Sequence, residues 1–305
     1  MSAAGSGPHS AITNVAAFQA PSAGNPVAAL TVLGAYLRHL RTERGLTIKQ
    51  VAPEVHASIS KISRIEGGEH SVKDCDVFAL LSFYEVTDSE HLEGIRALLE
   101  ASRRNPWWQA FNDVTPGWFR RLIGLEACAQ CIRTYEWEYV PGLLQTQAYA
   151  RAIVERGLPP GASAYEVDQR VQLRLNRQLL LDRAGSPDVL ALMDESVLWR
   201  PYGGPAVMCR QLEKLRDLTR RDGINLRFIP YEACVTSTSL TYLVFPPGGG
   251  LQDLIYLEAP DHARYLTKPE EVQSYKGQMV RLQQAAASRG ESLELLEAAI
   301  ARYRA

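Results

Sequence analysis

The chain has 305 residues, of which 46% are hydrophobic and 22% are charged, and its formal net charge is −1. This composition is typical of a soluble globular protein, and the length allows two or three domains. No apolar run approaches the ~18 residues of a membrane span, and no Lys or Arg precedes Arg38, which argues against a signal peptide. The five cysteines are scattered and do not predict a disulfide framework: Cys75, Cys128, Cys131, Cys209 and Cys234. We therefore expect a cytoplasmic protein without a membrane segment.

Charge and composition change along the N-terminal part of the chain. Residues 1–30 contain no Lys, Arg, Asp or Glu and are rich in Ala, Gly, Ser and Pro, so we expect a disordered tail. Between Leu33 and Lys73 the net charge is +3, which leaves −4 for the rest of the chain. A basic segment on a mildly acidic body is typical of a nucleic-acid-binding module.

Residues 31–104 show the periodicity of five short helices. Gly45 is expected to end the first helix, Thr47 and Gln50 form the pattern of a capping box at the start of the second, and Ser58 can cap the third. The apolar residues that mark the successive helices are Leu33, Tyr36, Leu37 and Leu40; Ile48, Val51, Ala52 and Val55; Ile62 and Ile65; Val77, Leu80, Leu81 and Tyr84; Leu92, Ile95 and Leu99. The pattern predicts a compact all-helical domain.

The second and third of these helices fit a helix-turn-helix centred on residues 47–66. The two helices of this motif cross closely, so its fifth residue must be small, and Ala52 is. The second helix lies in the major groove with its first residues at the base edges. By that geometry Ile59, Ser60 and Arg64 can face bases, and arginine commonly binds guanine. The remaining candidate DNA-binding residues are Ser58 at the cap and the expected phosphate contacts Lys49, Gln50, Lys61 and Ser63.

The stretch "LGAYLRHLRTERGLTIKQVAPEVHASISKISRIEGGEHSVKDCDVFALLSFYEV" resembles the DNA-binding domain of the xenobiotic-response-element class of helix-turn-helix regulators. The resemblance is clearest in "SISKISRIEGG", and it implies binding to double-stranded DNA. Three positions depart from the pattern of the class. His56 stands where glycine is usual, so we expect a positive φ there. Pro53 lies inside the second helix and removes a backbone hydrogen bond, and Ile48 replaces a glutamine that commonly contacts phosphate.

Residues 105–305 mix helical and strand patterns. Helices are expected over 119–128, 145–156, 165–183 and 207–221, and in a pair that begins at Pro269; strands are expected over 132–140, 189–193, 224–229, 240–245 and 254–257. The alternation predicts an α/β or α+β domain with a small mixed sheet. We therefore expect a multidomain chain with a tail (1–30), an all-α helix-turn-helix domain (31–104) and a regulatory, partner-binding and dimerisation domain (105–305).

The larger domain also resembles a known type. The segments "WFRRLIGLEACAQCIRTYEWEYVPGLLQTQAYARAIVE" and "RVQLRLNRQLLLDR" are similar to the uncharacterised, antitoxin-like C-terminal domain carried by many actinobacterial regulators of this class. The resemblance covers residues 107–303. It implies a regulatory role and a small opposing protein encoded nearby as partner.

No residue set in this domain predicts catalysis, a cofactor or a metal site. Cys128 and Cys131 form a single C-x-x-C on an expected helix, without a second pair, and two buried small residues explain them as well as a metal site does. The Asp-Glu-Ser sequence at 194–196 is either a carboxylate pair or a helix cap. The glycine runs at 203–204 and 248–250 lack the lysine of a phosphate loop and indicate turns. We expect no enzyme activity.

Arg170, Arg174 and Arg177 fall at i, i+4 and i+7 on one expected helix. This spacing is typical of a solvated helix face, and it also suits a site for an acidic ligand or partner. Because the resemblance implies a small partner protein, we treat the three as candidate partner-binding residues for an acidic protein. On an exposed face, their replacement by Glu would abolish the complex and leave the domain folded.

Together these patterns favour a homodimeric, sequence-specific transcriptional regulator whose larger domain binds a partner or effector. One recognition helix covers only a half-site, so we expect a dimer joined through residues 107–305. The alternative is an antitoxin-like interaction module that sequesters a small neighbouring-gene protein and regulates its own expression. A DNA-tethered enzyme is the least supported of the three hypotheses.

Overall fold

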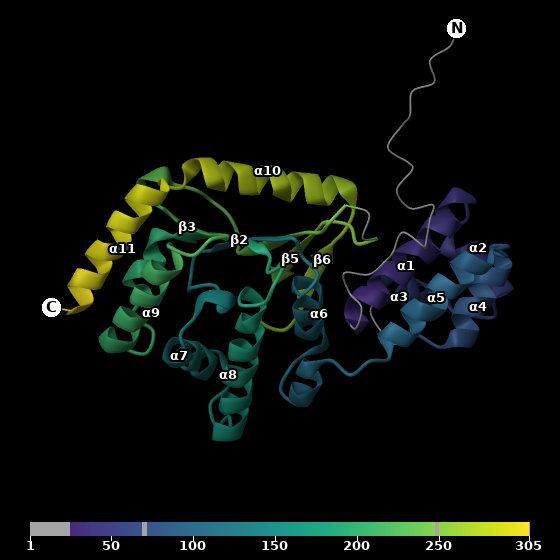
Figure 1. Ribbon diagram of the computed structural model, residues 1–305, viewed down its shortest axis with the longest axis horizontal. Helices are drawn as coiled ribbons and strands as arrows, with labels where there is room; N and C mark the ends of the chain where they lie inside the picture. Colours follow the sequence, from purple (N-terminus) through teal and green to yellow (C-terminus); the bar gives the residue numbers. More distant parts are fainter. Residues whose placement is uncertain (1–24, 69–71, 248–249, 305) are drawn as a thin grey trace, which may run out of the picture. The chain divides into compact units, whose positions relative to one another are not determined.

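The computed structural model describes residues 25–68, 72–247 and 250–304 and divides into two compact units. The first unit runs to Gln109 and also contains Phe245–Gln252, and the second contains Ala110–Val244 and Asp253–Ala305. The expected order, a helical domain followed by a larger mixed domain, is confirmed (Figure 1). No described helix is both long and apolar enough to cross a membrane. Most of the expected tail, residues 1–24, lies outside the described residues.

The first helix corrects the expected end of the tail at residue 30, because it begins at Pro26. The Asn25 side chain caps it by accepting hydrogen bonds from the backbone N–H groups of Val27 and Ala28 at 3.1 and 3.3 Å. Proline suits the first helical position, where no N–H is needed. The sequence pattern missed this turn because its residues have the same Ala- and Pro-rich composition as the tail.

The helical unit contains the five helices expected from the sequence: α1 (Pro26–Glu43), α2 (Ile48–Glu54), α3 (Ile59–Gly67), α4 (Asp74–Phe83) and α5 (Ser89–Ser102). Their inward residues form one buried cluster that includes Leu37, Val51, Ile62, Leu80 and Ile95. The expected caps are confirmed, since Ser58 Oγ accepts from the N–H of Lys61 and Gly45 takes φ 65° after α1. Apolar periodicity and capping residues were therefore enough to predict the five helices of this unit.

The second unit is built around six strands: β1 (Cys131–Glu136), β2 (Asp188–Asp194), β3 (Ile224–Ile229), β4 (Leu240–Val244), β5 (Leu254–Glu258) and β6 (Ala263–Leu266). Its helices are α6 (Gly117–Glu126), α7 (Gln147–Gly157), α8 (Ala164–Gln178), α9 (Pro205–Leu218), α10 (Pro269–Ala285) and α11 (Arg289–Arg304). The strand expected over 132–140 stops at Glu136, and β6 was not expected. Cys131 begins β1, so the expectation that it lies on a helix was wrong.

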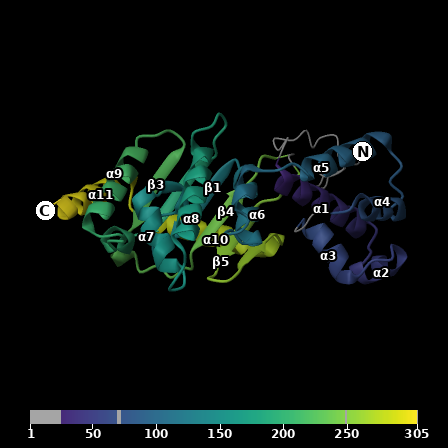
Figure 2. The ribbon, with the colours of Figure 1, turned by 90° about the horizontal axis from the view of Figure 1, so that it is seen from below.

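The six strands form a single mixed sheet in the order β3-β2-β1-β4-β5-β6. The strands β1, β2 and β3 are parallel, whereas β4 is antiparallel to β1 and continues into an antiparallel meander with β5 and β6. Helix α10 covers one face, where Val272 and Met279 share a buried cluster with Tyr135, Tyr242 and Ile255 (Figure 1). Helices α7 and α8 lie on the other face (Figures 1 and 2).

The topology marks one place on this sheet for a site. Strand β1 has a parallel neighbour on one side and an antiparallel neighbour on the other. From the carboxyl end of β1 the chain continues through α7 and α8 to the parallel neighbour β2. The neighbour on the other side, β4, begins the antiparallel half of the sheet. Open sheets commonly bind ligands at the carboxyl ends of strands at such a switch point.

Candidate functional site

A buried ion pair fixes α3 against α1. Glu66 is 4% exposed, and its two carboxylate oxygens accept hydrogen bonds from Arg41 Nε and Nη2 at 2.7 and 2.8 Å. Arg38 Nη2 donates to the Glu66 carbonyl oxygen at 3.2 Å. A Cβ at Gly34 would lie 2.6 Å from the carbonyl oxygen of Ile65, so glycine permits this close helix crossing. The buried ion pair and the close crossing at Gly34 therefore set the orientation of α3 against α1.

The outward face of α3 carries the side chains expected to read bases. Ile59 is 49% exposed, an unusual position for an aliphatic residue, and the other exposed residues of this face are Ser60, Ser63 and Arg64. Arg64 Nε donates to the Ser60 carbonyl oxygen at 3.3 Å. Apolar groups recognise the thymine methyl group, and arginine recognises guanine. This face therefore carries chemistry suited to base edges in a major groove.

Two of the expected phosphate contacts are already engaged. Lys61 Nζ lies 2.7 Å from Asp76 Oδ1 of α4. Gln50 Oε1 accepts from the Thr47 N–H and hydroxyl groups at 2.9 and 2.8 Å, which confirms the capping box and leaves the amide NH₂ group as a donor. Lys49 is exposed and forms no ion pair with the described residues. Asp76 therefore competes with a phosphate for Lys61.

The turn between α2 and α3 accommodates the departures from the class pattern. His56 takes φ 49°, as expected at a position where glycine is usual. The Ala57 N–H donates to the Ala52 carbonyl oxygen at 2.9 Å and closes the turn. Pro53 lies inside α2, as expected. The helix-turn-helix geometry is retained with these residues in place.

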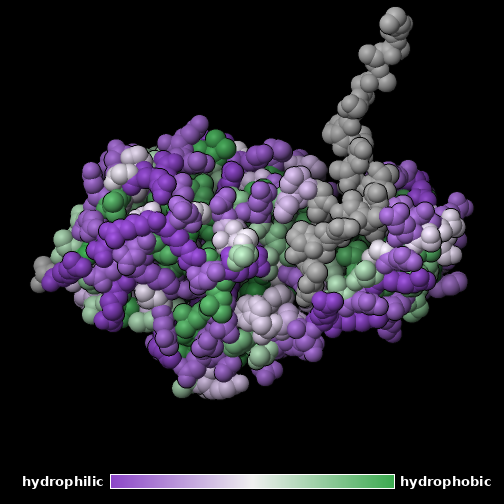
Figure 3. All heavy atoms as spheres, in the orientation of Figure 1, coloured by the Kyte–Doolittle hydropathy of each residue, from purple (hydrophilic) through white to green (hydrophobic). Residues whose placement is uncertain are grey.

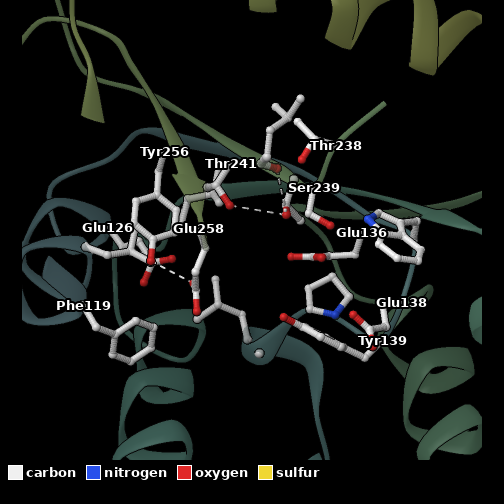
Figure 4. Close-up of a pocket in the computed structure, with 18 of the residues that line it drawn as sticks. Phe119, Glu126, Glu136, Glu138, Tyr139, Thr238, Ser239, Thr241, Tyr256 and Glu258 are labelled. Atoms are coloured by element: carbon white, nitrogen blue, oxygen red, sulfur yellow. Dashed lines mark hydrogen bonds between the residues drawn. The ribbon is translucent and has the colours of Figure 1, made fainter. Parts of the chain in front are cut away.

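A cavity of about 370 Å³ lies at the carboxyl ends of β1 and β5 in the second unit (Figure 4). Strand register builds one of its walls. Thr134 of β1 pairs with Thr241 of β4, which pairs with Tyr256 of β5, so the three side chains share one row across the sheet. The cavity therefore occupies the switch point of the sheet.

The next row on the same face consists of Glu136, Ser239 and Glu258. Glu136 and Glu258 each lie two residues from a member of the first row, so strand alternation keeps them on the same face, and Ser239 immediately precedes β4. Ser239 forms a hydrogen bond with the Glu136 carboxyl group, and Glu258 Oε2 accepts from the Tyr256 hydroxyl at 2.8 Å. Figure 4 shows both carboxyl groups pointing into the cavity from different sides.

The first carboxyl group of this row has a shifted pKa. Burial raises the pKa of Glu136 to about 8; the nearby carboxylates of Glu258 and Glu138 raise it too, whereas Ser239 and the Arg177 guanidinium act in the opposite direction. Glu136 is therefore mostly protonated at neutral pH, and its carboxyl group can donate a hydrogen bond as well as accept one.

Helix α8 supplies the facing wall. Arg177 Nε and Nη2 donate to the two carboxylate oxygens of Glu126 at 2.6 and 2.5 Å, and these side chains are 11% and 1% exposed. The guanidinium carbon of Arg177 lies 5.2 Å from the centre of the Phe119 ring. A Cβ at Gly142 would approach Arg177 Nη1 to 3.2 Å and Arg174 Nη1 to 3.6 Å. Glycine thus gives both guanidinium groups room beside the loop.

Arg174 differs from its neighbour because it forms no ion pair with the described residues. Its Nη1 donates to Gln145 Oε1 at 3.4 Å, and burial, together with the charge of Arg177, lowers its pKa. Gln145 is fully buried and donates to the Val140 carbonyl oxygen at 2.7 Å, while Lys214 Nζ donates to the Gln145 carbonyl oxygen at 2.7 Å. These hydrogen bonds fix the loop that contains Gln145 beside Arg174, whose guanidinium group has no ion-pair partner among the described residues.

Comparison with known families follows the division into two units. Residues 119–298, more than half of the chain, match the family model described as "Domain of unknown function (DUF5753)". The chain belongs to the DUF5753 family. Residues 32–93 match a model described as "Helix-turn-helix domain", which suggests DNA binding. No curated protein and no solved structure matches the chain.

The three arginines of the DUF5753 domain do not form the exposed face expected from their spacing. Arg170 pairs with Glu166 at 2.8 Å, whereas Arg174 and Arg177 line the cavity. Their spacing places them on one side of α8, but that side packs toward the sheet. Replacement of all three by Glu would set a further carboxylate against buried Glu126, so the variant can no longer be expected to fold.

The other candidates in the DUF5753 domain have structural roles. Asp194 Oδ1 accepts from the Ser196 N–H at 2.9 Å, so this acidic residue acts as a helix cap. Cys128 is buried. Within the described residues, no group of three or more His, Cys, Asp or Glu side chains could hold a metal ion. The sequence pattern had not indicated the pocket residues Glu126, Glu136, Gln145 and Glu258.

Proposed function

We propose that this protein is a sequence-specific transcriptional regulator of the xenobiotic-response-element class. Helix α3 enters the major groove of double-stranded DNA in the cytoplasm, and the DUF5753 domain binds a small effector without chemical turnover. The observation that carries the DNA-binding part is the exposed face of Ile59, Ser60, Ser63 and Arg64 on a helix whose opposite side is held by the Glu66–Arg41 pair.

A small effector is favoured over an acidic protein partner. Two of the three arginines that would have received an acidic protein are recessed, since Arg177 is paired with Glu126 and Arg174 lines the cavity, and the third, Arg170, is 38% exposed but paired with Glu166. A cavity of about 370 Å³ lies within the size range of small-molecule sites, roughly 300–1,000 Å³. A metabolite fits a recess of this size, whereas a flat protein surface would not reach its walls.

The DNA-binding proposal predicts two opposite effects. Replacing Arg64 by alanine should weaken binding to a selected operator by about 1–3 kcal/mol and relax the preference at one base pair. Replacing Asp76 by asparagine should release Lys61, so binding should tighten for all sequences and its salt dependence should steepen by about one phosphate contact. Both are measured by fluorescence anisotropy at several salt concentrations.

Arg104 provides the matched control, because it is exposed on the same unit and forms no ion pair with the described residues. Its replacement by alanine should leave the operator preference unchanged. If Arg64→Ala and Arg104→Ala lose affinity equally and both keep the parent's base preference, α3 does not read the bases.

We further propose that the protein is a homodimer joined through its second unit. Apart from Ile59 and Trp107, the large apolar residues of the helical unit are used in its own core. Several exposed large hydrophobic residues belong to the second unit: Tyr165, Leu179, Val280 and Leu293. Hydrophobic residues also interrupt the hydrophilic surface of the face in Figure 3. Light scattering should give a dimer for the full chain and for the fragment 110–305. A monomeric full chain, or a monomeric fragment beside a dimeric full chain, would show that this proposal is wrong.

A further inference from the structure

Arg174, Glu136 and Glu258 line the DUF5753 cavity without an ion-pair partner among the described residues. Arg174 belongs to α8. Glu136 and Glu258 point into the cavity from the sheet (Figure 4). None of the three pairs with another, although all of them line the same space. The nearby pair of Arg177 with Glu126 shows that this wall can form a close ion pair where two groups meet.

The spacing of these groups explains why they remain apart. Glu136 and Glu258 end the strands on either side of β4, and Ser239 immediately precedes β4. Neighbouring strands lie about 4.8 Å apart, so the two backbone positions are roughly 10 Å apart. Arg174 belongs to the facing layer, where the Gln145 network holds it. An occupant must therefore satisfy opposite charges on opposite walls.

The cavity also offers apolar surface between its polar walls. Phe119, Leu122, Trp137 and Pro141 line it together with the hydroxyl groups of Thr238, Ser239 and Tyr139. Pockets of this kind bind a ligand through apolar contacts and orient it through a few polar groups. A polyvalent anion would be repelled by the carboxyl groups of Glu136 and Glu258, and a polyamine would be repelled by Arg174. A molecule with one positive and one negative group can place each group beside the wall of opposite charge and so avoids both repulsions.

We propose that this cavity binds a small zwitterion, an amino acid or dipeptide with an apolar side chain. Its ammonium group lies at the row of Glu136, Ser239 and Glu258, and its carboxylate lies at Arg174. The apolar side chain contacts Phe119 and Leu122. This assignment deepens the proposed regulatory function, on which its biological meaning rests, because it names the class of effector.

Calorimetric titration of the full chain tests the assignment with matched probes. L-phenylalanine and L-alanyl-L-phenylalanine carry both charges, N-acetyl-L-phenylalanine lacks the positive charge, and L-phenylalaninamide lacks the negative one. At least one of the two zwitterions should bind saturably, and the N-acetyl and amide compounds should bind roughly tenfold more weakly or worse. Equal binding of all the probes, or no binding of either zwitterion, would overturn the proposal.

Variants identify which wall recognises which charge. Glu258→Gln changes an exposed side chain, so the domain should stay folded, and the variant should lose the discrimination against the N-acetyl compound. Arg174→Gln should lose the discrimination against the amide, with circular dichroism as the folding control. Glu294→Gln, the same chemical change at an exposed position of α11, should bind like the parent. A folded Glu258→Gln protein that discriminates like the parent contradicts the assignment.

The outcomes for the two proposals are separable. Operator binding by the parent protein is measured without any amino acid, so its failure would refute the regulator and leave the zwitterion site intact. Conversely, operator binding beside a failure of both zwitterions to bind would refute the site and leave the regulator intact.

Discussion

Replacing Glu66 by alanine is expected to lower the free energy of unfolding of the helical unit by about 3–5 kcal/mol, because it leaves the buried Arg41 guanidinium without its carboxylate. The loss is large because Arg41 is 12% exposed and cannot be fully rehydrated without moving α1. Since the same pair orients α3, operator binding should fall even at temperatures where the protein remains folded.

The measurement is urea denaturation followed by far-ultraviolet circular dichroism, together with operator titration. Glu93→Ala removes a carboxylate from an exposed position of α5 and serves as the matched control, with an expected change within about 0.5 kcal/mol. If Glu66→Ala is no more destabilising than Glu93→Ala, the ion pair does not hold α3 in place.

Stability of the second unit is expected to fall as the pH rises from about 5 to 8, by up to about 1.4 kcal/mol per pH unit from Glu136 alone. Burial raises the pKa of this carboxyl group from 4.5 to about 8 in the folded protein. Between these values the folded state keeps a proton that the unfolded state has released. Stability is therefore fully present at low pH and is lost as the pH approaches the folded-state pKa.

Glu136→Gln isolates this contribution, because glutamine mimics the protonated carboxyl group at every pH. The free energy of unfolding of both proteins is measured with denaturant at pH 5.5, 7 and 8.5. The stability of the parent relative to the variant should fall steadily as the pH rises. Glu294→Gln, on an exposed face of α11, should give a difference that does not change in this way. A pH-independent difference for Glu136→Gln would mean that the carboxyl group is ionised throughout.

Local signals in the sequence were sufficient for the helical unit, except for the first turn of α1. The caps at Thr47 and Ser58, and the apolar spacing behind them, act within four residues of their targets, so they can be recognised without knowledge of the fold. The strand β6 was missed because its four residues, Ala263–Leu266, include a charged side chain and show little alternation of apolar and polar residues.

The candidate site depended on partners that are distant in sequence. Arg41 and Glu66 are 25 residues apart, and Glu126 and Arg177 are 51 residues apart. Helical spacing placed three arginines on one side of α8 but did not reveal that a sheet packs against that side. An acidic residue at the end of an apolar strand, such as Glu136, was the one local signal of the pocket, and only the strand register gave it a neighbour.

The segment Phe245–Gln252 has a consequence for how such proteins can be recombined. It belongs to the helical unit, where Leu251 packs against the core, yet it connects β4 to β5 of the second unit. A single crossover between two genes near residue 109 would therefore separate the helical unit from Leu251, which packs against its core. The two modules are expected to be inherited together, because the strands beside the cavity, β4 and β5, are covalently continuous with a segment of the module proposed to bind DNA.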